Sequence, residues 1–192
     1  MHKRIYYIVN GITLYRMIAA SLLLLLIIGH RSEVFKWLLA ISFSTDAIDG
    51  YFASKYKVIS KLGAKLDSIA DDLTIAVAMI GMGVFQPEFL MHEIGLIITL
   101  FVLFVLQTVF AFFRYKKMSS FHTYGAKIAA ILQGIFLLLL FFLDEPVYIL
   151  FYVTVAVTAI ELVEEIIIVQ LLPQWEANVK GLYWVIRKKQ SG

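Results

Sequence analysis

Residues 94–113 read IGLIITLFVLFVLQTVFAFF, an apolar run of 20 residues without a single charge. A helix of about 20 apolar residues is long enough to cross the hydrocarbon core of a bilayer, since each residue adds ~1.5 Å. The whole chain has the same character: 61% of its 192 residues are hydrophobic, 16% are charged, and the mean hydropathy is +0.85. This composition indicates an integral membrane protein and excludes a soluble domain.

Five other stretches have a similar length and apolar character. Together they give six expected transmembrane helices, at residues 8–28, 34–52, 65–85, 94–113, 126–143 and 147–172. No Pro-, Gly- or Ser-rich linker separates them, so we predict a single membrane domain covering residues 1–192. The predicted fold class is all-α. The absence of cysteine excludes disulfides and thiolate metal sites.

The lysines and arginines fall mostly on one side of the expected membrane. That side carries Lys3, Arg4, Arg16, Lys55, Lys57, Lys61, Lys65, Arg114, Lys116, Lys117, Lys127, Lys180, Arg187, Lys188 and Lys189. The opposite side carries only Arg31 and Lys36. By the positive-inside rule, both termini and the segment between the second and third helices face the cytoplasm of a multi-pass cell membrane protein. Residues 175–189 mix aromatic and basic side chains and are expected along the cytoplasmic interface.

Residues 46–71 read DAIDGYFASKYKVISKLGAKLDSIAD and hold four aspartates around a short basic loop: Asp46, Asp49, Asp67 and Asp71. Carboxylates beside a bilayer core are costly without a partner, and a divalent cation is the favoured partner for such a cluster. Residues three or four apart share a helix face, and a short loop makes the two helices antiparallel neighbours. The carboxylates are therefore expected to converge near the cytoplasmic surface. Oxygen ligands suit Mg²⁺, Mn²⁺ or Ca²⁺, and four carboxylates are enough for two ions.

Small residues lie beside the aspartates. Gly50 and Ala53 follow Asp49, and Gly63 lies one turn before Asp67. Small side chains let a phosphate or a nucleotide approach the backbone closely. Alone, these residues would favour helix packing within a membrane. Beside four aspartates, we interpret them as part of a substrate site.

This spacing resembles the signature of the CDP-alcohol phosphatidyltransferase family, D-x2-D-G-x2-A-R-x8-G-x3-D-x3-D. Seven positions match in register between Asp46 and Asp71, and Ser54 stands where the family usually has arginine. A second stretch, NGITLYR at residues 10–16, is similar to the N-x-x-T-x-x-R start of the first helix in family members. The resemblance extends over nearly the whole chain, because the family has six helices with the motif at the junction of the second and third.

The resemblance implies a phospholipid-synthesising transferase. In the family reaction, an alcohol hydroxyl attacks the β-phosphorus of a CDP-linked lipid such as CDP-diacylglycerol, and CMP leaves. The implied metal ligands, for two ions of Mg²⁺ or Mn²⁺, are Asp46, Asp49, Asp67 and Asp71. Asp71 is also the implied general base for the hydroxyl proton.

The resemblance extends to substrate binding and assembly. The implied nucleotide- and phosphate-binding residues are Asn10, Thr13, Arg16, Gly50, Ala53 and Gly63. For Arg16, snorkelling of the side chain to the membrane interface is an equal alternative. Family members usually form homodimers. The expected partners are therefore the CDP-linked lipid, the alcohol, the bilayer and a second copy of the chain, with no nucleic acid.

The acceptor alcohol is expected to be anionic, because basic residues gather around the fourth and fifth helices. Lys127, in a stretch similar to the lysine-containing region of phosphatidylglycerophosphate synthases, and the nearby Arg114 are the candidates for binding it. Charge anchoring by the positive-inside rule is the alternative for such residues. Glu161 is a third candidate, with interfacial exposure as an equal alternative. Glycerol 3-phosphate is the first expectation, and inositol-phosphate, cardiolipin and zwitterionic headgroup synthesis stay open.

Two other functions compete with lipid synthesis. A divalent-cation transporter would use the aspartates as its ion site, but the chain has no inverted repeat and its acidic cluster lies near one surface. A catalytically inactive family member is the second alternative, motivated by Ser54. CMP release that depends on the metal and on Asp71 would distinguish a lipid synthase from a cation transporter and from an inactive family member.

Overall fold

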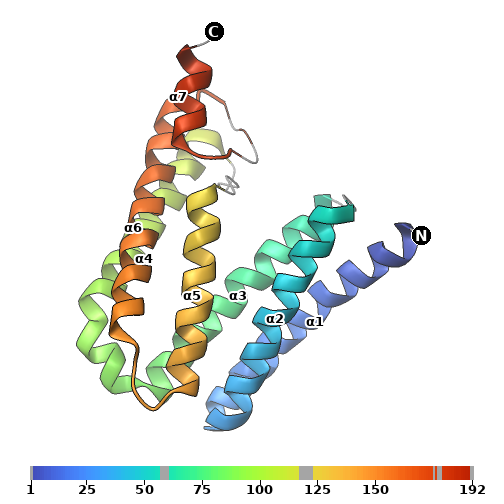
Figure 1. Ribbon diagram of the computed structural model, residues 1–192, viewed down its shortest axis with the longest axis vertical. Coiled ribbons are helices and arrows are strands. Elements are labelled where there is room, and N and C mark those ends of the chain that lie inside the picture. Colours follow the sequence, from blue (N-terminus) through green and yellow to red (C-terminus); the bar gives the residue numbers. More distant parts are fainter. Residues whose placement is uncertain (1, 57–60, 117–122, 175, 177–178, 191–192) are drawn as a thin grey trace. The chain divides into compact units, whose positions relative to one another are not determined.

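The computed structural model describes all residues except 1, 57–60, 117–122, 175, 177–178 and 191–192. The described residues form helices and no strand, which confirms the all-α class (Figure 1). The helices are α1 (His2–Ile28), α2 (Ser32–Tyr56), α3 (Lys61–Phe85), α4 (Pro87–Tyr115), α5 (Tyr124–Phe142), α6 (Tyr148–Leu171) and α7 (Leu182–Gln190).

Several helices extend beyond their predicted bounds: α1 begins at His2 and not at residue 8, and α4 begins at Pro87 and not at residue 94. Helix α2 continues to Tyr56 and α3 begins at Lys61, so Gly63 lies in the first turn of a helix and not in a loop. The residues between the two predicted helices, 53–64, include no proline, and several of them are alanine, leucine or lysine, which are good helix formers. Helix α2 therefore continues beyond its predicted end, and α3 begins before its predicted start. Pro87 begins α4, where a missing backbone N–H costs nothing.

Within the described residues, two helices are long and apolar enough to cross a membrane. They are α4 and α5, whose most apolar 18-residue stretches have mean hydropathies of 2.6 and 2.1. Large apolar side chains of α4 stay exposed, among them Phe101 at 64% and Phe113 at 69%. Such a surface is typical of contact with lipid and not with water. The six spans and the cytoplasmic termini stay predictions.

The helices fall into two compact units. The first contains Met1–Leu90 and Leu140–Asp144, which is α1, α2, α3 and the end of α5. In this unit α1 contacts both α2 and α3, and α2 contacts α3. Phe35 of α2 is fully buried, and its ring is so close to α3 that a Cβ at Gly81 would lie 2.6 Å from its Cζ atom. Glycine at 81 is therefore what lets α2 and α3 approach at this level.

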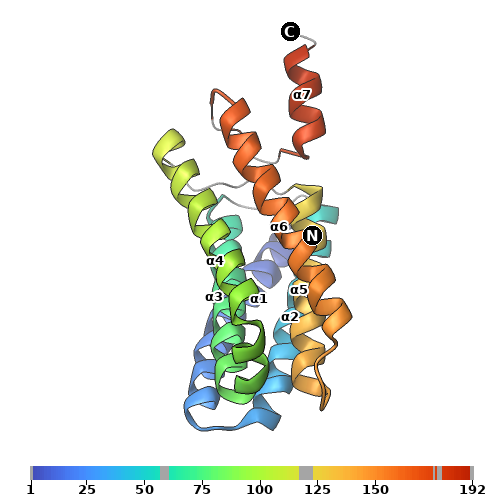
Figure 2. The same ribbon diagram turned by 90° about the vertical axis from the view of Figure 1, so that its left-hand side faces the viewer.

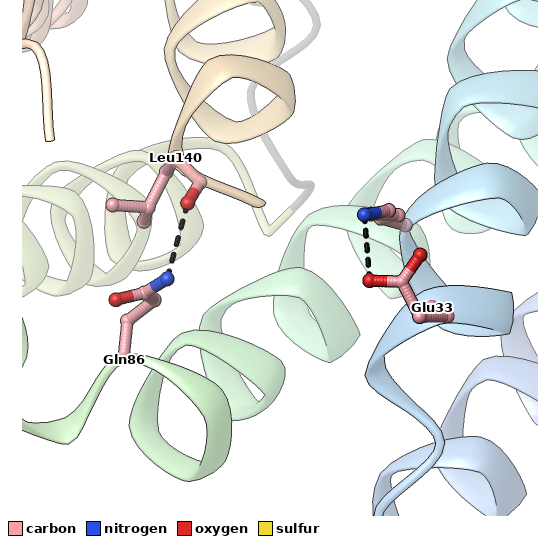
Figure 3. A network of polar contacts seen from close by, with 4 residues as sticks. Glu33, Gln86 and Leu140 are labelled. Carbon is pink, nitrogen blue, oxygen red and sulfur yellow. Dashed lines mark hydrogen bonds and ion pairs between the residues drawn. The ribbon is translucent and has the colours of Figure 1, made fainter. Parts of the chain in front are cut away.

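The end of α5 completes the first unit around the start of α2. The Phe141 ring meets Phe35 edge-on at 5.0 Å between centroids. The Gln86 amide donates a hydrogen bond to the Leu140 carbonyl at 3.3 Å, and the Lys36 ammonium pairs with Glu33 at 2.7 Å (Figure 3). The Phe35–Phe141 and Gln86–Leu140 contacts join the end of α5 to the start of α2 and to the end of α3.

The second unit contains Met91–Leu139 and Glu145–Gly192, which is most of α4, α5 up to Leu139, α6 and α7. Side-chain contacts join its helices: Gln133 of α5 donates to the Thr158 hydroxyl at 2.9 Å, and the Phe136 and Phe151 rings lie 5.2 Å apart. The Thr123 hydroxyl caps α5 by accepting a hydrogen bond from the backbone of Ala126 at 3.0 Å. Helix α7 lies beside the C-terminal end of α6 in both views (Figures 1 and 2).

Candidate functional site

The four aspartates of the motif lie on two helices of the first unit that contact each other. Asp46 and Asp49 belong to the C-terminal half of α2, and Asp67 and Asp71 belong to the N-terminal half of α3. Because both segments are helical, Asp46 and Asp49 share one face of α2, and Asp67 and Asp71 share one face of α3. Their side chains lie outside the described part of the structure, so their role as metal ligands stays a prediction.

The other motif residues belong to the same three helices. Asn10 and Thr13 lie on α1, Gly50 and Ala53 on α2, and Gly63 on α3. Their side-chain surroundings are also outside the described part of the structure. Because α1 contacts both α2 and α3, the three helices that carry the proposed nucleotide and metal residues form one packed group.

Arg16 is the one residue of the nucleotide-binding set whose side chain is described, and it is buried, with 2% of its surface exposed. It continues the buried face of α1 that includes Ala19, Ala20 and Leu23. A snorkelling arginine keeps its guanidinium at the surface, so this burial disfavours the snorkelling alternative. A buried guanidinium requires polar or anionic partners, which is consistent with a role beside a carboxylate- and phosphate-binding site.

Small residues lie on the buried sides of α1 and α3, which contact each other. Ala19 and Ala20 of α1 and Ala70 and Ala78 of α3 are all buried. The Thr74 hydroxyl, also buried, donates to the Ala70 carbonyl within α3 at 2.8 Å. Small residues allow helices to pack closely in a membrane. This alanine pattern was missed in the sequence, although small residues spaced by four or eight on α3 are a readable signal.

Two of the acceptor candidates take part in other contacts. Arg114, in the last turn of α4, donates to the carbonyl of Leu172 at 3.3 Å and to that of Gln170 at 3.4 Å. It therefore covers carbonyl groups at the end of α6, a role that the sequence did not reveal. Lys127 is exposed near the start of α5, with its ammonium 5.7 Å from the centroid of the Tyr124 ring. Both residues belong to the second unit, and binding of the acceptor alcohol by either one stays a prediction.

The third acceptor candidate, Glu161, is buried in the second unit. It is 8% exposed and hydrogen-bonds to Glu165, which is equally buried. Glu165 in turn accepts a hydrogen bond from the Gln107 amide of α4 at 2.6 Å. The alternative of exposure at the interface is therefore wrong for Glu161. Glu161, Glu165 and Gln107 therefore form a polar network inside the second unit.

A third buried carboxylate, on α4, was not singled out by any sequence pattern. Glu93 of α4 is 5% exposed and accepts a hydrogen bond from the Tyr152 hydroxyl at 2.8 Å. The His92 Nδ1 atom lies 2.8 Å from the same carboxylate oxygen. Glu93 and Tyr152 are 59 positions apart, so the contact depends on how α4 and α6 pack.

The described side chains contain no group of three or more His, Asp or Glu residues arranged to hold a metal ion. The four aspartates are not among those side chains, so this finding does not test them. Their chemistry fits a hard divalent cation, since two contacting helices supply carboxylate oxygens and no softer ligand competes in a chain without cysteine.

Residues 6–163 match the family model described as CDP-alcohol phosphatidyltransferase. A similar protein is the CDP-diacylglycerol--inositol 3-phosphatidyltransferase of Saccharomyces cerevisiae (strain ATCC 204508 / S288c), at 37% identity over 98 residues. The match covers 50% of this chain and 44% of the yeast protein, so it spans less than half of the relative's length. No solved structure gives a significant match. The family match includes α1, α2 and α3 from residue 6 onward, and it ends before Glu164 and α7.

Proposed function

The chain belongs to the CDP-alcohol phosphatidyltransferase family, and from this premise we propose that it transfers a substituted phosphate group from a CDP-linked lipid to an alcohol hydroxyl. The hydroxyl oxygen forms a bond to the β-phosphorus, the phosphoanhydride bond breaks, and CMP leaves. The observation that carries the proposal is the seven-position motif between Asp46 and Asp71, placed on α2 and α3 in contact. Its role in the cell is phospholipid synthesis.

Asp46, Asp49, Asp67 and Asp71 are proposed to hold two ions of Mg²⁺ or Mn²⁺. When bound, such ions neutralise the charge that develops on the pyrophosphate and on the leaving CMP. Asp71 takes the proton of the attacking hydroxyl, because a carboxylate placed within hydrogen-bond reach of that proton acts as a general base. The packing of α1 against α2 and α3 supports this assignment, since it brings the helices of the two matching motifs together.

Arg16 is proposed to support the phosphates of the CDP-linked lipid from α1, together with Asn10 and Thr13. Its burial on the α1 face that packs within the first unit supports the proposal. A guanidinium offers five donors in a planar fork and matches the geometry of phosphate oxygens. Gly50, Ala53 and Gly63 leave room beside the aspartates for the nucleotide.

The acceptor alcohol is proposed to be glycerol 3-phosphate or another anionic alcohol, bound with the help of Lys127, Arg114 and Glu161. The exposure of Lys127 supports its availability to an anionic ligand. Inositol is a second candidate acceptor, because the name of the yeast relative specifies it. The protein is further proposed to be a multi-pass cell membrane homodimer whose active site faces the cytoplasm.

The proposal is tested with the purified chain in detergent, CDP-diacylglycerol, and Mg²⁺ or Mn²⁺. A panel of acceptors would include glycerol 3-phosphate, inositol, inositol phosphate and serine. Release of CMP and the mass of the lipid product are measured together, so that hydrolysis is distinguished from transfer. We expect one acceptor to give a phospholipid in a metal-dependent reaction.

Folded, metal-binding protein that releases no CMP with any acceptor would overturn the enzyme assignment and favour an inactive family member. Uptake of Mn²⁺ into vesicles containing the chain, without CMP release, would instead favour the transporter alternative. A lipid product that forms equally well in the Asp71→Asn variant would exclude the proposed general base.

A further inference from the structure

Helix α7 lies beyond the region that matches the family, and a single carboxylate holds its first residue. Glu164 of α6 accepts a hydrogen bond from the backbone N–H of Leu182 at 2.7 Å. The backbone N–H of Tyr124, at the start of α5, donates to the Lys180 carbonyl at 3.2 Å. The start of α7 is therefore tied to both α5 and α6.

Two glycines make room for the Glu164 carboxylate. A Cβ at Gly181 would lie 3.0 Å from one of its oxygens, and a Cβ at Gly125 would lie 3.1 Å from the other. Gly181 also has a φ of +148°, a backbone conformation that other residues adopt only with strain. The carboxylate thus occupies the space that side chains at both positions would fill, and Glu164 acts as a positioning residue for α7.

The buried side of α7 fixes its rotation about its own axis. Val185 is 6% exposed and belongs to an apolar cluster with Ala111 of α4 and with Ile168 and Val169 of α6. Leu182 packs against the same cluster. The opposite side of α7 must therefore face outward, since residues 182 and 185 lie within one turn of each other on one side of the helix.

The outward side carries Tyr183, Trp184, Ile186, Arg187 and Lys188, which we call the aromatic–basic face. Tyr183 is 64% exposed and Trp184 is 45% exposed. The Trp184 ring lies 5.5 Å from the rings of both Tyr183 and Tyr124, measured between centroids. Exposed clusters of tryptophan and tyrosine are typical of the interface between a bilayer and water, where a ring has one apolar and one wet side.

The basic residues lie further along the helix than the aromatic ones. Helix α7 runs in the same general direction as the end of α6 (Figures 1 and 2). Arg187 and Lys188 are each four residues beyond Tyr183 and Trp184, which corresponds to ~6 Å along the axis. At the predicted cytoplasmic end of α6, this order places the rings nearer the acyl chains and the cations nearer the lipid phosphates.

The charge around this face is positive. Arg187 and Lys188 are exposed, as are Lys180 before α7 and Lys127 on α5. The Lys188 ammonium pairs with the Glu176 carboxylate at 2.8 Å. Each basic residue near a membrane surface strengthens attraction to anionic lipid, and each such residue changes the binding constant roughly fivefold.

We propose that the aromatic–basic face of α7, held in place by Glu164, binds the anionic headgroups of the bilayer that contains the chain. The ligand chemistry is a phosphodiester with net negative charge in the leaflet at the C-terminal end of α6. The inference rests on the membrane placement within the proposed function, and it adds a lipid-binding surface outside the family region.

The test uses fluorescence of Trp184 in the full-length chain. The sequence has three tryptophans, so Trp37→Phe and Trp175→Phe leave Trp184 as the sole emitter. The protein is reconstituted in phosphatidylcholine vesicles that contain equal mole fractions of either brominated phosphatidylcholine or brominated phosphatidylglycerol. We expect quenching by both lipids and severalfold stronger quenching by the brominated anionic lipid. Raising the salt concentration is expected to reduce that preference, because salt screens exposed charges.

Two variants separate the lipid-binding surface from charge in general. Arg187→Gln/Lys188→Gln is expected to remove the preference for the anionic lipid, whereas Arg31→Gln/Lys36→Gln, with the same loss of charge at the predicted external side, is expected to keep it. Equal quenching by the two lipids, no quenching by either, or an unchanged preference in Arg187→Gln/Lys188→Gln would overturn the proposal. Equal quenching would indicate an aromatic contact without charge recognition, no quenching would favour a protein partner, and an unchanged preference would assign the recognition to other basic residues.

A second pair of variants tests the role of Glu164. Glu164→Ala removes the acceptor of the Leu182 N–H and is expected to abolish the lipid preference while the protein stays monodisperse. Glu164→Gln keeps an accepting oxygen and is expected to retain the preference. Retained preference in Glu164→Ala would show that Glu164 does not position α7. None of these readouts depends on CMP release, so a failure of the transferase assignment is distinguishable from a failure here.

Discussion

The amide of Gln107 on α4 donates a hydrogen bond of 2.6 Å to the buried carboxylate of Glu165 on α6, across 58 positions of sequence. Both residues are buried, with 2% and 8% of their surfaces exposed. Glu165 also contacts Glu161, so the amide supports a carboxyl pair that has little access to water. This relationship fixes one side of α6 against α4 and leads to the first prediction.

Replacing Gln107 with leucine keeps the approximate volume of the side chain but removes its donor. A buried carboxylate that loses a hydrogen bond carries its desolvation cost without compensation, so we expect Gln107→Leu to destabilise the protein by about 1–3 kcal/mol. The measurement is thermal unfolding in detergent. Gln170→Leu, on the exposed side of α6, is the matched control and should change little. Equal melting temperatures for the two variants would show that the Gln107 contact contributes nothing.

The close approach of α2 and α3 at Gly81 gives the second prediction. A Cβ there would lie 2.6 Å from the Phe35 ring, so Gly81→Ala is expected to destabilise the protein by about 1–3 kcal/mol through overpacking. Adding Phe35→Leu to this variant should recover part of the lost stability, because leucine is smaller than the ring that the new Cβ would meet. Gly95→Ala is the control, since nothing lies within 4 Å of the added Cβ. Denaturant titration followed by circular dichroism measures all four proteins, and a neutral Gly81→Ala would contradict the packing argument.

Asp71 and Asp72 are adjacent and have the same charge, which makes them a matched pair. Asp71 occupies the last position of the motif, whereas Asp72 lies about 100° away around α3. We expect Asp71→Asn to lower the rate of CMP release by about 10²–10⁴-fold, the range of general base catalysis, and Asp72→Asn to have a small effect.

Removal of divalent metal provides an independent check on the same site. Addition of EDTA should abolish CMP release in the unmodified protein, and excess Mg²⁺ or Mn²⁺ should restore it. If Asp72→Asn proves as damaging as Asp71→Asn, the proposed division of roles between the two residues is wrong. Turnover that persists after complete metal removal would exclude the metal-dependent mechanism.

Ser54 is the one departure from the family signature and gives the last prediction. Introducing the family's arginine adds a planar donor fork near the proposed phosphate site, so we expect Ser54→Arg to lower the KM for the CDP-linked lipid. Ser54→Lys adds the same charge without the fork and should have a smaller effect. Steady-state kinetics at saturating acceptor separates KM from kcat. An unchanged KM in both variants would indicate that position 54 does not contact the phosphates.

Several features of the site could be predicted because they depend on neighbours in sequence. The helices follow from apolar runs, and the aspartate pairs follow from spacings of three and four. The matched family region confirms the family resemblance drawn from the residues between Asp46 and Asp71. The boundaries at Tyr56 and Lys61 were harder to predict, because charged residues and glycine interrupt the apolar run without stopping the helix.

Other features were decided only by tertiary packing. The capping of α6 by Arg114, the contact of Glu93 with Tyr152, and the holding of α7 by Glu164 each join residues that lie far apart in the chain. A carboxylate on an apolar helix is costly in lipid wherever it points, so the sequence shows that Glu161 and Glu165 need partners without showing which residues those are.

The sequence by itself indicated the family of the protein, its long apolar helices and the position of its aspartate motif, because these properties are set by composition and by spacing within one helix. The tertiary structure decided which side of each helix is buried. Helices that are apolar nearly all around carry no periodic signal for their buried side. The partners of Arg16, Gln107 and Glu164 therefore depend on how each helix is rotated against its neighbours, which only the packed structure defines.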